Sequence, residues 1–131
     1  MKRTVLIGVS ALAFSVSATA SPAFGQATNE QMEMAYNSAR NQLGVLKYCQ
    51  NQGHIDGEAA AVQTKLIALI PAPANTDKGD EAEKTGERGT IAAMGVNQDL
   101  AASAKAQNVT EKQFCDVVAN AIKQVATQLP K

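Results

Sequence analysis

The sequence contains no tryptophan, and among its 131 residues it has one histidine, two cysteines and four prolines. A single histidine cannot form a Ser-His-Asp or Cys-His catalytic site unless a nucleophile lies within its reach, and no motif supplies one. We therefore interpret His54 as a surface residue of the turn from Asn51 to His54. We predict no catalytic residue and no enzyme activity.

Ligands for a metal ion are equally scarce. One histidine and two cysteines are too few to build a zinc site. The acidic residues between Asp77 and Glu87 lack the spacing of an EF-hand, so we interpret them as a solvated run of charge. No glycine-rich phosphate loop follows a strand pattern. We expect no metal, no cofactor and no small-molecule substrate.

The chain has no excess charge of either sign, with twelve Lys/Arg and twelve Asp/Glu. Removal of Lys2 and Arg3 with a signal peptide leaves ten bases against the same twelve acids. A balance this close to neutral gives no basic surface for the phosphates of a nucleic acid. Nucleic acid is therefore not an expected partner.

The longest apolar run is at the start of the chain. Lys2 and Arg3 precede an uncharged run from Val5, rich in alanine and serine, which is typical of the n-region and h-region of a secretory signal peptide. The run is short for a membrane span and is interrupted by serines. We predict a signal peptide at residues 1–25 and one mature domain at residues 26–131, located in the periplasm or secreted.

Two cleavage points fit the small-x-small rule. One lies after Ala20 and the other before Gln26, and we favour Gln26 because the polar mature sequence begins there. In an exported chain, the two cysteines Cys49 and Cys115 predict one disulfide. Closing so long a loop contributes roughly 4 kcal/mol in the chain-entropy model.

Helical patterns fill most of the mature chain. Thr28 to Gln31 forms a capping box, and apolar residues then recur every three or four positions until Gly53 ends the helix. Asp56 is the expected N-cap of a second helix, which the prolines from Pro71 stop.

The segment from Asp77 to Gly89 is open to two interpretations. Its charges and glycines favour a flexible stretch. Alternatively, small residues spaced by three and four from Gly79 to Leu100 form a seam on which another helix backbone can approach closely. We predict a regular third helix at residues 90–106 and leave the residues before it undecided.

A second capping box, Thr110 to Gln113, starts the last helix, which Pro130 ends. No strand alternation appears after residue 25. The predicted fold class is all-α, a small four-helix bundle with one disulfide.

Membrane action needs more than one helix. After the signal peptide the longest uncharged runs are residues 66–76 and 89–98, far short of the ~20 residues that span a bilayer. A chain of this kind acts on a membrane only by exposing amphipathic helices and assembling them.

The order of these features resembles a family. A signal peptide, the segment from Gln26 to Cys49, the Ile70-Pro-Ala-Pro73 turn and Gln113-Phe114-Cys115 are similar to small exported alphaproteobacterial proteins of the pore-forming ESAT (early secretory antigenic target) family. The resemblance implies a non-enzymatic protein that acts by helix association with a membrane or a protein partner, further copies of the chain included. The Trp-x-Gly turn of the wider class is absent here, so no functional residue is carried over.

A looser similarity relates the chain to HdeA-type periplasmic acid-stress chaperones, which are small helical proteins with one disulfide between two helices. Twelve carboxylates become protonated in acid and leave a positive, self-repelling domain. This similarity implies an alternative function as a periplasmic stress chaperone.

Overall fold

The computed structural model describes residues 28–129. The predicted signal peptide at 1–25, its cleavage point and Pro130 lie outside the described residues. The described part contains five helices and one β-hairpin. In chain order they are α1 (Asn29–Asn51), α2 (Glu58–Ile67), α3 (Asp77–Glu87), β1 (Thr90–Ala93), β2 (Val96–Asp99), α4 (Leu100–Ala106) and α5 (Glu111–Thr127).

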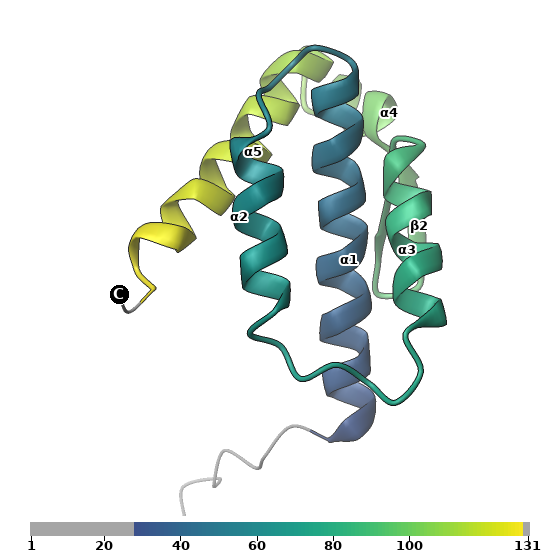
Figure 1. Cartoon of the computed structure of the whole chain (residues 1–131). Helices are drawn as coiled ribbons and strands as arrows, with labels where there is room; N and C mark the ends of the chain where they lie inside the picture. The colour runs from purple at the N-terminus through teal and green to yellow at the C-terminus, as the bar shows by residue number, and fades with distance from the viewer. Residues whose placement is uncertain (1–27, 130–131) are drawn as a thin grey trace, which may run out of the picture.

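Helix α1 is the central element, with α2 and α5 on one side and α3 with the hairpin on the other (Figure 1). Its start confirms the predicted capping box, because the Thr28 side chain accepts from the Gln31 backbone N–H and the Gln31 side chain accepts from the Thr28 N–H. Gly53 follows its end with a φ of 72°, a backbone conformation that glycine adopts without strain.

Helix α2 begins one residue later than predicted. Gly57 takes the N-cap position, whereas the Asp56 carboxylate accepts from the Glu58 backbone N–H. The helix ends at Ile67, and Pro71 lies in the loop that leads to α3.

The undecided segment from Asp77 is helical through Glu87. The predicted helix at 90–106 is wrong in its first half, where β1 and β2 pair as an antiparallel hairpin, with Thr90 opposite Asp99 and Ala93 opposite Val96. Met94 and Gly95 have φ values of 51° and 78°, as a two-residue type I′ turn requires. The regular spacing of small residues across this turn is therefore not one continuous helix.

Helix α4 is the helical remainder of that prediction. The Asp99 carboxylate caps it by accepting from the Ala102 N–H. The second capping box is confirmed, because Thr110 and Gln113 exchange the same pair of hydrogen bonds at the start of α5.

The part of the chain that the structure describes is thus mostly helical with one disulfide, and it contains five helices and a hairpin where the sequence predicted four helices. Two clusters of buried apolar side chains form its core. One gathers around the disulfide and Leu100, and the other joins α1, α2 and α5 around Leu46 and Ile122. Neither cluster contains a residue of α3.

Candidate functional site

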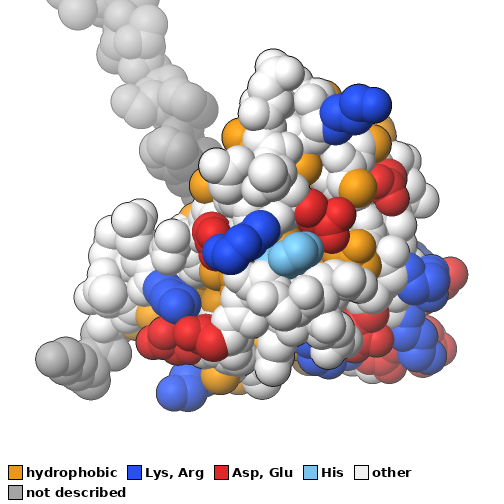
Figure 2. All heavy atoms as spheres, turned by 90° about the horizontal axis from the view of Figure 1, so that it is seen from above, with side chains coloured by type: hydrophobic (Ala, Val, Ile, Leu, Met, Phe, Trp, Pro, Cys, Tyr) orange, Lys and Arg blue, Asp and Glu red, His pale blue; other side chains and the backbone are white. Residues whose placement is uncertain are grey.

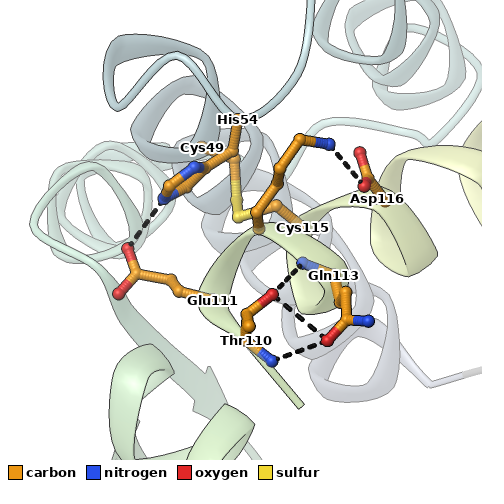
Figure 3. Close-up of a disulfide and its surroundings, with 8 residues drawn as sticks. Cys49, His54, Thr110, Glu111, Gln113, Cys115 and Asp116 are labelled. Atoms are coloured by element: carbon orange, nitrogen blue, oxygen red, sulfur yellow. Dashed lines mark hydrogen bonds and ion pairs between the residues drawn. A yellow bond between two sulfur atoms is a disulfide. The ribbon is translucent and has the colours of Figure 1, made fainter.

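The predicted disulfide is present between Cys49 and Cys115. The Cα atoms lie 5.8 Å apart, and both residues are fully buried. The bond fastens the last turns of α1 to the first turn of α5, as Figure 3 shows. A fully buried disulfide is a structural link, because exchange requires a thiolate to reach one of its sulfur atoms.

His54 lies in the turn after α1, as predicted, with one acidic partner. Its Nε2 is 3.4 Å from Oε1 of Glu111 in the first turn of α5, beside the disulfide (Figure 3). Figure 2, which views this end of the molecule, shows the histidine at the surface between acidic and basic side chains. The neighbouring Glu111 carboxylate also raises the pKa of Tyr48.

The structure brings Glu111 to His54 from another helix. The pair joins the turn after α1 to α5 close to the disulfide. Within residues 28–129, no group of three His, Cys, Asp or Glu side chains is arranged to hold a metal ion.

An apolar hollow runs along α1. We call it the α1 groove; its volume is about 480 Å³. Helix α1 forms its floor, and β1 and α5 form its two walls. Its lining residues are Ala35, Ser38, Ala39, Asn41, Gln42, Val45, Ile91, Ala92, Ala93, Phe114 and Val118.

A second hollow of about 610 Å³ adjoins the α1 groove, because Ser38 and Ala92 line both. Two methionines, Met34 and Met94, lie in it, together with acidic side chains at the start of α1. One of these acids, Glu33, pairs with Lys78 at 2.8 Å. The two hollows form one long depression that is apolar along α5 and flanked by charge near the start of α1.

Met94 is the most exposed large apolar residue of the described part, with 90% of its surface accessible. It also has a positive φ of 51°, a backbone conformation that costs a side-chain-bearing residue roughly 1–2 kcal/mol. A methionine at this position is both strained and exposed. Neither burial nor the geometry of the turn explains why a methionine occupies position 94.

On the other side of the molecule, an ion cluster centred on one buried carboxylate joins α3 to α1. Glu83 is only 8% exposed; it accepts from Nε of Arg40 at 2.5 Å and from Nζ of Lys47. Arg40 also pairs with Asp80 at 2.6 Å, and Lys47 with Glu87 at 3.1 Å.

Burial raises the pKa of Glu83, but the hydrogen bonds from Lys47 and Arg40 outweigh it, so the pKa lies below its ordinary value. Burial lowers the pKa of Arg40, but its hydrogen bonds with Tyr36 and Glu83 outweigh burial and raise that pKa. The hydrogen bond with Glu83 raises the pKa of Lys47. The interpretation of this segment as a solvated run of charge is therefore wrong for Glu83. The sequence contains one signal for this cluster. Arg40 and Lys47 lie on one face of their helix, and the acids of α3 recur at a similar helical spacing.

Asn41 links three elements. Its Nδ2 donates to the Ala82 carbonyl of α3 at 3.0 Å and to the Thr90 carbonyl of β1 at 3.1 Å, and its Oδ1 accepts from the Ala92 N–H at 2.9 Å. The amide thus pairs with the outer edge of β1 as a neighbouring strand would. This bonding fixes β1 as a wall of the α1 groove, and sequence reasoning did not find it.

None of the helices in residues 28–129 is long and apolar enough to cross a membrane. Comparisons with protein-family models, with curated proteins and with solved structures found no match to this chain.

Proposed function

We propose that this chain is an exported, non-enzymatic binding protein whose α1 groove takes up an amphipathic helix of a protein partner. The observation that carries the proposal is the groove itself, an apolar depression of a volume typical of ligand sites. Export is supported by the n-region and h-region pattern of residues 1–25 and by the disulfide, which is a bond of oxidising compartments.

The shape of the groove favours a helix as the occupant. Its floor on α1 presents Ala35, Ser38 and Ala39, which are small residues at helical spacing. Small side chains let a second helix approach closely, and the apolar walls then cover one face of that helix. This mode agrees with the helix association that the resemblance to the ESAT family implies.

Met94 is a second and independent observation in favour of a binding role. Strained and exposed residues persist where function retains them, and methionine is a flexible side chain that adapts to apolar partners. Met34 lies in the same depression. The two methionines extend the apolar surface of the groove toward the start of α1.

The charge near the start of α1 defines the partner further. Glu30 and Glu33 border the depression there, and Lys78 forms its ion pair with Glu33. An occupant with lysine or arginine at this end is complementary to Glu30. The proposed ligand is therefore an amphipathic helix with an apolar face and a basic end.

Fluorescence anisotropy with a labelled Leu/Ala/Lys amphipathic peptide of about 18 residues tests this proposal. We expect Ala39→Phe, which fills the floor, to weaken binding by about tenfold or more. Ala121→Phe adds the same bulk on an exposed face of α5 and leaves binding unchanged. No binding by the wild-type chain, or equal loss in both variants, refutes the groove as the site.

Dye release from anionic liposomes separates pore formation from protein binding. Leakage by the mature chain, greater after reduction of the disulfide or in acid, supports membrane action of the kind implied by the family resemblance. Intact liposomes together with peptide binding support the groove proposal.

A periplasmic stress chaperone of the HdeA type is the second candidate. Exposed apolar side chains away from the groove, Leu69 and Val117 among them, favour it because they can contact unfolded clients. This function predicts that the chain suppresses aggregation of a client protein in acid while the liposomes stay intact. Aggregation that proceeds unchanged at every pH excludes it.

A further inference from the structure

Helix α3 has almost no apolar side chain with which to hold its place. Its sequence runs from Asp77 to Glu87, and Ala82 is its only apolar residue apart from the glycines. Neither buried apolar cluster includes a residue of α3. Since apolar burial is the usual force that docks a helix, other interactions must hold this one.

Glycines supply the fit between α3 and α1. A Cβ atom on Gly44 of α1 would lie 2.0 Å from the Glu83 carbonyl oxygen, and one on Gly86 of α3 would lie 2.3 Å from the Asn41 carbonyl oxygen. The two backbones are therefore in direct contact. Such a contact requires close approach and is lost as soon as the helices separate.

Ion pairs supply the attraction. Glu83 lies between Arg40 and Lys47, while Asp80 and Glu87 pair with the same two cations from either side. The Tyr36 hydroxyl accepts from Arg40 at 3.0 Å. Helix α2 contributes only neutral side chains, Thr64 and Ile67, to the hollow beside Glu83, and β1 has no ionisable residue.

Helix α3 is not continuous with the helix before it or the strand after it. A loop with Pro71 and Pro73 precedes it, and Gly89, with a φ of 80°, follows it. Beyond Gly89, Ile91 packs against the core cluster around the disulfide, and Asn41 holds the edge of β1. The hairpin thus has anchors of its own.

We propose that α3 is an electrostatic strap that releases from α1 in acid while the disulfide-linked body of α1, α2, α4 and α5 stays folded. Release uncovers the side of α1 that carries Tyr36 and Leu43, both buried in the closed state. The wall of the α1 groove formed by β1 stays in place. Release of α3 is therefore a separate proposal from binding in the α1 groove, and the failure of one does not affect the other.

The direction of the pH effect follows from Glu83. Its pKa is lower in the folded protein than the ordinary value of 4.5, so its contribution to holding α3 is complete above that value. The contribution is lost as the pH falls through the lowered value. Protonation also leaves Arg40 and Lys47 facing a neutral group, and these cations then repel one another.

Hydrogen exchange measured by mass spectrometry on the oxidised mature chain tests the strap. After correction for intrinsic rates, we expect exchange in residues 77–87 to rise by about tenfold or more between about pH 7 and about pH 3. The amides of α5 change much less. Unchanged protection of α3, or parallel loss in α3 and α5, overturns the proposal.

A matched pair of variants isolates the buried carboxylate. Glu83→Gln removes the charge and keeps the shape, and we expect it to expose residues 77–87 to exchange already at about pH 7. Glu81→Gln removes an exposed charge from the same helix and behaves as the wild type. Full protection of α3 in Glu83→Gln, or loss of α5 protection along with it, contradicts the strap.

A third variant tests the close approach at all pH values. Gly86→Ala places a methyl group against the Asn41 carbonyl, so α3 cannot seat on α1 even when Glu83 is ionised. Exchange in residues 77–87 is then fast and nearly independent of pH. A Gly86→Ala chain that retains the wild-type pH profile excludes the backbone contact as part of the strap.

Discussion

At the scale of single residues, Asn41 links three elements. It is 2% exposed, and its side-chain amide joins α1 to α3 and β1 through three hydrogen bonds. A buried polar group that loses its hydrogen-bond partner destabilises the fold by about 1–3 kcal/mol. Three backbone groups have Asn41 as such a partner.

We expect Asn41→Leu to lower the free energy of unfolding by about 3 kcal/mol, because it leaves three backbone groups without partners in a nearly unchanged volume. Urea denaturation of the oxidised chain measures the change. Asn120→Leu, at an exposed position of α5, should stay within about 0.5 kcal/mol of the wild type. Equal effects of the two substitutions contradict this role of Asn41.

Met94 permits a prediction in which stability and binding move in opposite directions. Asn accepts a positive φ more readily than Met, so Met94→Asn should raise the free energy of unfolding by about 0.5–1 kcal/mol. The same change removes an exposed apolar side chain beside the groove and should weaken binding of the amphipathic peptide.

Met94→Leu is the matched control for that variant, because it keeps the apolar bulk and the strain. Denaturation and anisotropy on the same two proteins give both quantities. If Met94→Asn binds the peptide as tightly as the wild type does, Met94 has no part in binding.

At the scale of elements, the close contact of α1 with α3 depends on glycine on both helices. We expect Gly44→Ala to destabilise the chain by about 2 kcal/mol, because the added Cβ would overlap the Glu83 carbonyl and outweigh the better helix propensity of alanine. Gly57→Ala is the control, since its Cβ would meet only the end of the flexible Gln50 side chain at 3.1 Å. Thermal unfolding of both variants measures the two changes in stability. A Gly44→Ala chain as stable as the wild type contradicts the close packing of α1 on α3.

The elements that local rules determine were predictable. Both capping boxes, at Thr28 and Thr110, were found, because each motif lies within four consecutive residues. The hairpin was missed because small residues at spacings of three and four imitate a helix there. Its turn also has Met94 before Gly95, where asparagine is the usual signal.

The candidate site was less predictable than the helices. Glu83 and Arg40 are separated by 43 positions, and the sequence alone does not say which acids of α3 meet which cations of α1. The α1 groove arises from three elements whose arrangement depends on the hairpin, so the missed hairpin concealed it. Only the disulfide, the one pairing that two cysteines allow, was found in full.

At the scale of the whole molecule, the disulfide ties the α5 side to α1 across 66 positions. We expect the paired substitution Cys49→Ala and Cys115→Ala to lower the free energy of unfolding by roughly 3–4 kcal/mol. Urea denaturation with and without reductant measures it, and reduction of the wild type should reproduce the loss. A chain equally stable in both redox states contradicts a structural role for the bond.

The link between Cys49 and Cys115 also has a consequence for how the chain is made. Within residues 28–129 there is no free cysteine, so the chain has a single intramolecular pairing and no wrong disulfide to reshuffle. Maturation then requires an oxidant and no isomerase. Because 66 positions separate Cys49 from Cys115, the bond can form only after both have been synthesised and folding has brought them together.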